Sequence, residues 1–326
     1  MSHAALWTAG RILFGLAVFV LGLAVLRFGL RTVWSARTER LLARLVRTPA
    51  RGLCTGIGAT VLTQSSAAVT VMSMALVGAG ALRFADTVGI VLGTNIGSTF
   101  TVGLLTLGPE RLAPYLIAGG AAAFAGAHLF APAALRRRAR ALAVSAAGFG
   151  TLFIGFAAIE GALAPLASSP AALHWLLMAK AHPIAGVLAG TAVTAMIGSS
   201  SASTAMVLAL AETSALPLPA AIALVLGNNI GTCITAVLAG IGGSRDVQRV
   251  AAAHVLLNVA GAAVFLGILH PFALLVQTVA HSPGGQVAVA HFLYNAICSL
   301  AALPFARAIA RALTRWLPER KTERKE

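Results

Sequence analysis

A short polar stretch occurs twice in this apolar chain of 326 residues, and the repetition sets the plan of the whole molecule. The first copy reads TQSSAAVT at residues 63–70, and the second reads IGSSSAST at residues 197–204. Each copy is followed by a related motif, GTNIGS at 93–98 and GNNIGT at 227–232. Both pairs are 134 positions apart without a gap (197 − 63 and 227 − 93), which indicates an internal duplication. The sequence therefore predicts two related halves.

The composition indicates a membrane protein. Hydrophobic residues make up 58% of the chain and charged residues 10%, with a mean hydropathy of +0.88. Soluble domains average about 45–50% apolar and about 25% charged residues. We therefore expect an all-α integral membrane protein. No small-residue cleavage site follows the first apolar segment, so we expect that segment to stay as a span and not to be removed as a signal peptide.

The formal charge of +15 does not indicate a nucleic-acid-binding protein. The basic residues flank apolar segments, and no basic patch interleaved with aromatic residues is present. The three cysteines, at positions 54, 233 and 298, lack CxxC spacing, so we expect neither a metal site of that kind nor a disulfide framework. We also expect no cofactor.

Seven apolar segments are long enough to cross a bilayer, which takes about twenty helical residues. They lie near residues 11–30, 86–107, 113–133, 141–165, around 228–229 and on to 241, 250–269 and 287–306. The two serine stretches interrupt other apolar segments, 52–77 and 183–211, at their middle. Each half has about a dozen residues and is too short to cross roughly 30 Å at 1.5 Å per residue. These segments predict re-entrant helical hairpins, whose tips must be buried in protein or line an aqueous cavity.

The GTNIGS and GNNIGT motifs predict a broken transmembrane helix in each half. In both motifs two glycines flank a short polar run near the middle of a span. Such a pattern favours local unwinding, after which free carbonyls can bind cations and a half-helix N-terminus can bind an anion.

The distribution of Lys and Arg predicts the orientation. All but three of the 24 such residues, Arg11, Arg111 and Lys180, fall in regions 27–51, 83, 136–140, 245–249 and 307–325. The positive-inside rule then places the N-terminus outside and the C-terminus in the cytoplasm. The first hairpin would open to the cytoplasm and the second to the exterior, so the two repeats would be inverted. Inverted repeats with broken helices are typical of alternating-access transporters in the cell inner membrane or plasma membrane.

These features predict five regions. They are an N-terminal transmembrane helix with an amphipathic cytoplasmic helix at 1–51, a first repeat at 52–133, a connecting helix and loop at 134–182, a second repeat with its following helices at 183–306, and a basic cytoplasmic tail at 307–326. We expect the amphipathic helix to lie on membrane lipids, with a solvated linker as the alternative.

The polar residues of the four motifs are candidates for one binding site. Hydroxyls, amides and free carbonyls suit an alkali cation, while hydroxyl and amide hydrogens can hold an oxyanion. One cavity could therefore bind Na⁺ and an anion together, with Thr70 and Thr204 in support. The alternative is that small polar residues only bridge packed helices. Because the motifs bring no Lys or Arg to the site, we expect a bound anion to need a cation that enters with it.

A smaller pattern pairs His and Asn four residues apart on one helix face. His254 with Asn258, and His291 with Asn295, show it. These residues either line the site or support its walls through hydrogen bonds, and we favour support.

The paired serine hairpins, each followed by a G-x-N-I-G-[ST] motif, resemble the type II sodium-phosphate cotransporter (Na/Pi cotransporter) family. The helices with A-H-x-x-x-N are similar to the later spans of that family, and the resemblance covers roughly residues 50–110 and 180–305. It implies Na⁺-coupled transport of inorganic phosphate. By this resemblance the substrate and ion site would consist of Gln64, Ser65, Ser66, Thr94, Asn95, Ser199, Ser200, Ser201, Asn228 and Asn229. Na⁺ itself would lie at Gln64, Ser65, Asn95, Ser199, Ser200 and Asn229.

Two positions depart from the family pattern. Ala67 replaces the third serine of the first tip, and Gly198 stands where the second tip usually has glutamine. These departures leave the number of Na⁺ ions and the identity of the anion open, as are the direction of transport and the choice between a monomer and a homodimer. We expect Gly198 to serve a tight turn, at which a larger side chain would clash. Because the chain ends soon after residue 306, we expect no appended regulatory domain.

A serine hydrolase within the membrane is the alternative from another functional class. Ser199 and His254 superficially resemble the residues of such an enzyme, which would need one serine within hydrogen-bond reach of a histidine. The first tip duplicates the serines without a matching histidine, so we expect a transporter with no catalytic residue.

Overall fold

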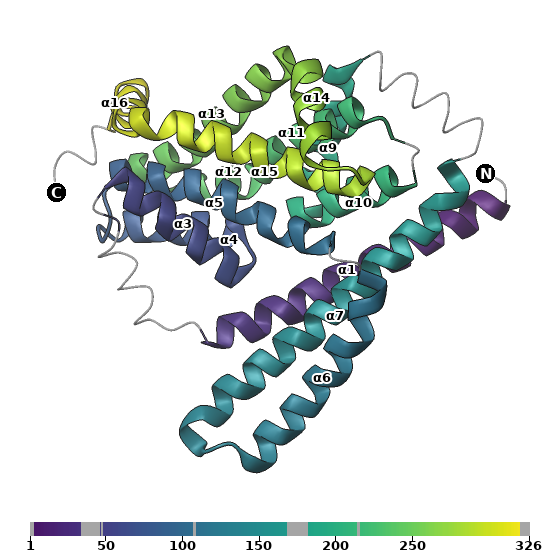
Figure 1. Cartoon of the computed structure of the whole chain (residues 1–326). Coiled ribbons are helices and arrows are strands. Elements are labelled where there is room, and N and C mark those ends of the chain that lie inside the picture. Colours follow the sequence, from purple (N-terminus) through teal and green to yellow (C-terminus); the bar gives the residue numbers. More distant parts are fainter. Residues whose placement is uncertain are drawn as a thin grey trace.

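The computed structural model describes residues 3–33, 46, 48–106, 109–167, 182–213 and 216–319, and within them the chain is helical with no strand (Figure 1). The helices of the first half are α1 (His3–Val33), α3 (Pro49–Thr63), α4 (Ser66–Gly78), α5 (Phe84–Leu105), α6 (Pro109–Phe130) and α7 (Ala133–Ala167). Those of the second half are α9 (Pro183–Ile197), α10 (Ser200–Glu212), α11 (Leu218–Thr232), α12 (Ile234–Gly240), α13 (Arg245–Gly267), α14 (Leu269–Val279), α15 (Pro283–Ala302), the 3₁₀ turn η1 (Leu303–Phe305) and α16 (Ala306–Trp316).

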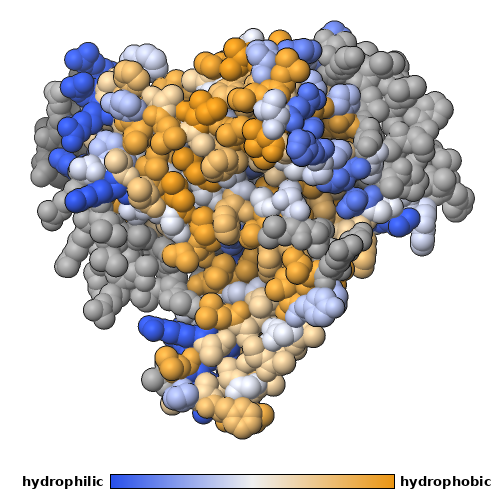
Figure 2. Space-filling model, in the orientation of Figure 1, coloured by the Kyte–Doolittle hydropathy of each residue, from blue (hydrophilic) through white to orange (hydrophobic). Residues whose placement is uncertain are grey.

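The seven predicted spans are confirmed by length and composition within the described residues. They are Leu6–Leu30, Phe84–Leu105, Leu112–Phe130, Leu135–Ala162, Leu218–Gly240, Arg245–Gly267 and Pro283–Trp316. Large apolar side chains also remain exposed on the outside of the molecule, as a lipid-facing surface requires; Met196 and Phe130 are 85% and 84% exposed. Figure 2 shows that hydrophobic surface occupies most of one face, with hydrophilic residues gathered toward its edges. The protein is a multi-pass membrane protein; its orientation stays a prediction.

The two hairpins have matching bounds at the 134-residue offset. The first comprises α3 and α4 at residues 49–78, and the second comprises α9 and α10 at residues 183–212. A proline begins the first helix of each hairpin, where its missing N–H costs no hydrogen bond. A serine caps the start of each second helix. The helical hairpins are as predicted; the first is three residues longer at its start and one at its end, and the second is one residue longer at its end. Their re-entrance into a membrane stays a prediction.

The predicted breaks at residues 93–97 and 227–231 are wrong. Helix α5 is continuous from Phe84 to Leu105, and α11 runs through its motif to Thr232. The glycines serve close helix packing: a Cβ at Gly93 would lie 2.1 Å from the carbonyl oxygen of Leu53, and one at Gly227 would lie 2.0 Å from that of Val187. Each polar motif therefore lies against the first helix of its own hairpin. The span of the second repeat is interrupted just after its motif, at Cys233 between α11 and α12.

Helix α16 forms the first half of the predicted basic tail at 307–326. Helix α16 packs against α5 and α13 with Ala310 and Leu313 buried. The buried guanidinium of Arg249 donates two hydrogen bonds, of 2.9 and 2.7 Å, to the carbonyl oxygen of Leu317. Helix α14 was not predicted. Most of the predicted amphipathic helix and nearly all of the predicted loop at 168–182 lie outside the described residues.

The long helices α1 and α7 cross each other closely, and α6 packs against α7 (Figure 1). Small residues permit the close approach: a Cβ at Gly22 would lie 2.3 Å from the backbone nitrogen of Leu152, and one at Gly155 would lie 2.2 Å from that of Phe19. Figure 1 also shows α3 and α4 on the left of the molecule and α9 and α10 on the right, with α5, α11 and α15 between them. Helix α1 thus lies outside the two repeats but reaches both hairpins.

Candidate functional site

The tips of the two hairpins have the same local geometry. Gln64 and Gly198 both adopt the left-handed conformation, with φ of 52° and 70°. Ser65 and Ser199 follow in extended conformation, and their hydroxyls accept hydrogen bonds from the backbone N–H groups of Ala68 (3.2 Å) and Ala202 (3.3 Å). A sharp turn and a serine cap thus start α4 and α10 alike.

Both tips line one small cavity. Its lining residues are Arg27, Gln64, Ser65, Ser66, Ala67, Ser98, Thr101, Gly198, Ser199, Ser200, Ser201 and Thr232. The structure therefore brings together all six predicted tip residues, from segments 134 positions apart. The cavity volume is about 20 Å³, and a water molecule needs roughly 10–15 Å³. This conformation has room for one water or one bare cation, and the tips must separate to admit a phosphate ion.

The cavity offers hydrogen-bond donors without an internal partner. Ser66, Ser200 and Ser201 are more than nine-tenths buried, and their hydroxyls make no hydrogen bond within the described part of the chain. Two of these serines are the first residues of α4 and α10, so two helix N-termini face the same space. Each N-terminus carries roughly half a positive charge. The arrangement favours an anion that can accept hydrogen bonds from several hydroxyls.

Arg27 is a site residue that the sequence analysis missed. It belongs to α1, lines the cavity, and donates a hydrogen bond of 2.9 Å from Nε to the backbone carbonyl of Gln64. The expectation that the site has no fixed cation is therefore wrong. In the sequence Arg27 reads as the start of the basic run 27–51, and only the crossing of α1 over the first hairpin places it at the tip.

The last residue of each G-x-N-I-G-[ST] motif also faces the cavity. Ser98 and Thr232 are 134 positions apart and line it from α5 and α11. Their shared place in the repeat was a signal that sequence reasoning could have used. The residues chosen from these motifs, by contrast, do not line the cavity; they are Thr94, Asn95, Asn228 and Asn229.

Asn228 joins the second hairpin to α11. Its side-chain amide lies 3.0 Å from the hydroxyl of Thr194, 2.8 Å from that of Ser203 and 3.1 Å from that of Thr204. All four residues are fully or nearly fully buried. Asn228 and Thr204 therefore fix the walls of the site. The nearby Asn229 donates to the carbonyl of Val225 at 2.9 Å within its own helix.

The equivalent network of the first repeat is incomplete. Thr94 takes the place of Asn228, and its shorter side chain donates to the carbonyl of Val91 (2.8 Å). Thr60 and Thr70, the counterparts of Thr194 and Thr204, are buried with no hydrogen-bond partner for either hydroxyl in the part of the chain described.

The His and Asn pairs lie in the protein core and not at the cavity. Asn258 donates to the carbonyl of His254 and Asn295 to that of His291, both at 2.9 Å. The side chain of Asn95 donates to that of Asn258 at 3.4 Å, which joins α5 to α13. The role of the pairs as support for the walls of the site stays a prediction.

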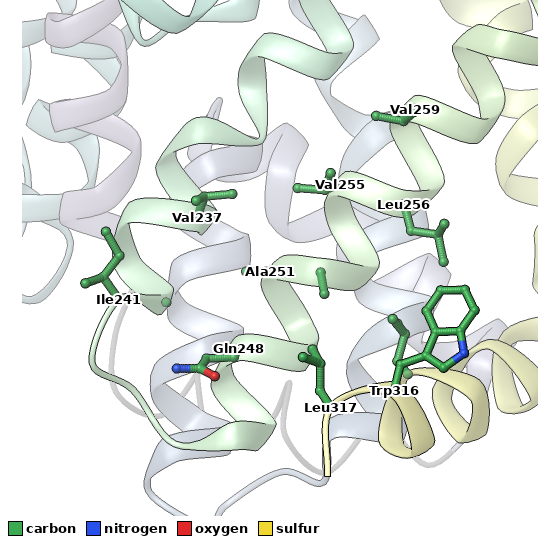
Figure 3. Close-up of a pocket in the computed structure, with 12 residues that line it drawn as sticks. Val237, Ile241, Gln248, Ala251, Val255, Leu256, Val259, Trp316 and Leu317 are labelled. Atoms are coloured by element: carbon green, nitrogen blue, oxygen red, sulfur yellow. The ribbon is translucent and has the colours of Figure 1, made fainter. Parts of the chain in front are cut away.

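A larger groove of about 660 Å³ lies on a different part of the molecule, between α12, α13 and α16 (Figure 3). Apolar residues such as Val255, Leu256 and Leu317 line most of it, and only Gln248 and Trp316 add polar side-chain atoms. It contains no group that could recognise an ion, so the tip cavity is the candidate site despite its smaller size.

Comparisons with known proteins agree with the resemblance seen in the sequence. A family model described as "Na+/Pi-cotransporter" matches residues 8–161 and 163–286. The chain is 30% identical over 303 residues to the uncharacterized protein YqeW of Bacillus subtilis, which covers 92% of this chain and 95% of that one. It is 28% identical over 302 residues to the "Putative inorganic phosphate export protein YjbB" of Salmonella typhimurium, and 27% to the protein of that name from Escherichia coli K12. The chain spans about half the length (54%) of these YjbB proteins. No solved structure matches it.

Proposed function

Since the chain belongs to the Na⁺/Pi-cotransporter family, we propose that it carries inorganic phosphate across the cytoplasmic membrane together with Na⁺, by alternating access. Family membership places it among transporters and not among enzymes, so the serine hydrolase alternative is wrong. The position of the histidines agrees, because neither His254 nor His291 lines the cavity with the serines.

The observation that carries the proposal is the single cavity shared by both serine tips. A transporter needs one site that two gates can reach in turn, and two hairpins whose tips meet provide it. The small cavity of about 20 Å³ would correspond to a form in which the two tips lie close together. Separation of one tip from the other would open the site toward one side of the membrane, and the equivalent movement of the other hairpin would open it toward the opposite side.

The argument for coupling to Na⁺ is that the negative charge of phosphate exceeds the positive charge that the cavity lining supplies. A phosphoryl group carries about −1.5 to −2 charges near neutral pH. Arg27 balances one of them, and no residue that lines the cavity in the described structure supplies another full positive charge. Backbone carbonyls and serine hydroxyls are oxygen ligands that suit an alkali cation. A Na⁺ ion that enters with the phosphate would complete the neutralisation.

Radiolabelled phosphate flux in proteoliposomes tests the proposal. We expect phosphate to move with an imposed Na⁺ gradient in whichever direction the gradient points, and to stop when K⁺ replaces Na⁺ on both sides. Influx and efflux are both measured, because some relatives bear names that refer to export. Absence of phosphate flux in either direction would refute the substrate. Flux that is indifferent to the replacement of Na⁺ would refute coupling and indicate a passive pathway.

A further inference from the structure

We propose that a groove beside helix α16 binds the phosphate headgroup of an anionic phospholipid. The groove has a volume of about 570 Å³ and shares no lining residue with the tip cavity. Arginines of α16 and of the start of α5 line it, together with Pro49, the first residue of the first hairpin. The inference is independent of the substrate that the tip cavity carries.

The sequence of α16 makes it an amphipathic helix. Ala310 and Leu313 are buried on the side that packs against α5 and α13. Arg307, Arg311 and Arg315 are exposed and lie four residues apart. Residues at this spacing share one face of a helix, so three guanidinium groups form a row along α16. A helix with one apolar and one basic face is typical of a segment that lies at a membrane surface.

The groove carries a net positive charge. Arg83 donates two hydrogen bonds, of 2.9 and 3.1 Å, to the carboxylate of Asp86, so these two charges offset each other. Within the described structure Asp86 is the only acidic residue that lines the groove. The three arginines of α16 make no hydrogen bond or ion pair through their side chains in that part of the chain. Three guanidinium groups are thus available for phosphate oxygens, whose geometry they match.

The position of α16 favours a lipid as the source of the phosphate group. The candidate span Pro283–Trp316 includes α15, η1 and α16, so the basic row directly adjoins an apolar helix of membrane length. Trp316, at the end of α16, is 71% exposed, and tryptophan is enriched at membrane interfaces. Basic clusters next to a span, and basic pockets between spans, bind anionic lipid headgroups. Figure 1 shows α16 at the upper left of the molecule, and in Figure 2 hydrophilic surface gathers at the same edge.

A bound headgroup would connect three parts of the fold. Helix α16 packs against α5, and α5 packs against α3 of the first hairpin. The groove touches all three, because Pro49 begins α3 and Arg83 precedes α5. A ligand that binds only the folded protein stabilises it by mass action. We therefore expect anionic lipid to hold the base of the first hairpin against α5 and α16 and to raise the thermal stability of the protein.

The experiment measures lipid binding to the purified full-length protein in a neutral detergent, by native mass spectrometry. The two probes are phosphatidylglycerol and phosphatidylcholine with the same acyl chains. We expect phosphatidylglycerol to bind more tightly, and its affinity to fall as the salt concentration rises. Arg311→Gln should weaken phosphatidylglycerol binding about fivefold, the usual contribution of one arginine near an anionic lipid surface. Arg307→Gln, Arg311→Gln and Arg315→Gln combined should weaken it about 100-fold.

Arg138→Gln is the matched control. Arg138 is also exposed, near the start of α7, and lines neither this groove nor the tip cavity. Its variant loses the same charge and should bind phosphatidylglycerol as the unmodified protein does. Arg311→Lys keeps the charge and should retain most of the affinity. A second measurement compares thermal unfolding in nanodiscs of the two lipids: phosphatidylglycerol should raise the midpoint of the unmodified protein and of Arg138→Gln more than that of the triple variant.

Three results would overturn the inference. The first is equal binding of the two lipids. The second is an equal loss of affinity in Arg311→Gln and Arg138→Gln, which would show that only the overall charge matters. The third comes from competition with glycerol phosphate, which carries the phosphate group without acyl chains: if it displaces phosphatidylglycerol at constant ionic strength, the groove is a site for a soluble anion. None of these measurements requires phosphate transport, so failure of the proposed function would leave the lipid site standing.

Discussion

Gln64 and Gly198 occupy the same position in two hairpin turns and have nearly the same backbone conformation, although only one of them is glycine. A non-glycine residue in the left-handed region carries a conformational cost of about 1–2 kcal/mol. Gln64 offsets that cost through its side chain, which donates from Nε2 to the carbonyl of Val61 at 2.7 Å and accepts a short hydrogen bond from Thr101. The duplicated turn is thus stabilised by side-chain contacts in one repeat and by glycine in the other.

Gln64→Ala should destabilise the protein by about 1–3 kcal/mol, because it leaves the buried hydroxyl of Thr101 without its acceptor and keeps a Cβ in the left-handed region. Gln64→Gly loses the same hydrogen bonds but adopts the turn freely. It should be less destabilising than the alanine variant by about 1 kcal/mol. Thermal unfolding in nanodiscs compares the two, and equal loss in both would show that the left-handed backbone carries no cost.

Gly198→Ala gives the complementary result for the second turn. A Cβ at Gly198 would meet nothing within 4 Å, so for alanine only the backbone cost applies, and the clash expected for a larger side chain stays a prediction. We expect a loss of about 1 kcal/mol in stability and continued phosphate transport. Loss of transport in a stable Gly198→Ala protein would contradict this account of the turn.

Ser66→Ala and Ser200→Ala should lower phosphate affinity without lowering stability. Their hydroxyls have no internal partner within the described residues, so their removal breaks nothing in the empty protein. We expect affinity to fall roughly tenfold for each and stability to change by no more than about 0.5 kcal/mol. Ser203→Ala is the matched control on α10, since its hydroxyl lies 2.8 Å from the amide of Asn228. Ser203→Ala should lose stability. If Ser200→Ala lost as much stability as Ser203→Ala, the hydroxyl of Ser200 would have a structural role, which would contradict the prediction.

Thr94→Asn should stabilise the first repeat by completing the network that Asn228 completes in the second. The unpaired hydroxyls of Thr60 and Thr70 would gain an amide partner, at about 1 kcal/mol for each bond. Gly56 is the counterpart of Gly190, at which a Cβ would lie 3.0 Å from the side-chain oxygen of Asn228. A rise in the thermal midpoint checks the prediction, with Thr94→Val as the control that adds no donor. A lower midpoint for Thr94→Asn than for Thr94→Val would refute it.

Gly93→Ala tests whether the motif glycines serve packing or unwinding. The added methyl group would lie 2.1 Å from the carbonyl oxygen of Leu53. Because that oxygen belongs to the backbone of α3, the clash can be relieved only if α3 and α5 move apart. We expect a loss of more than about 2 kcal/mol in stability. Gly103→Ala, on the same helix with open space at its Cβ, should be neutral or stabilising by up to about 1 kcal/mol. Equal behaviour of the two variants would argue against the packing role.

Much of the architecture could be predicted because it depends on length, polarity and repetition alone. Seven spans and two helical hairpins follow from apolar lengths, and the convergence of the six tip residues follows from the duplication. The continuity of α5 could not be predicted from its motif. Paired glycines around polar residues occur both where a helix unwinds and where two helices touch, and only the presence of α3 against Gly93 decides between them.

The cationic part of the site could not be predicted for a different reason. Arg27 is the first residue of the basic run 27–51, which is typical of a segment at the membrane interface. How deep Arg27 lies depends on how α1 crosses the first hairpin. That crossing is set by the glycines of α1 and α7, for example Gly22 against Leu152, which carry no polar signal. Ser98 and Thr232 were within reach of sequence reasoning, because both end a motif at the shared offset.

The unequal anchoring of the two turns bears on which gate moves first. Contacts from α1 and α5 fasten the first turn through Gln64, whereas no hydrogen bond from another helix reaches the turn at Gly198 in the described structure. Opening the first hairpin would break bonds that opening the second leaves intact. The outward- and inward-facing forms would then differ in free energy even without a substrate. The resting population of the carrier would therefore favour one side of the membrane. Under equal and opposite gradients, transport would be faster in one direction than in the other.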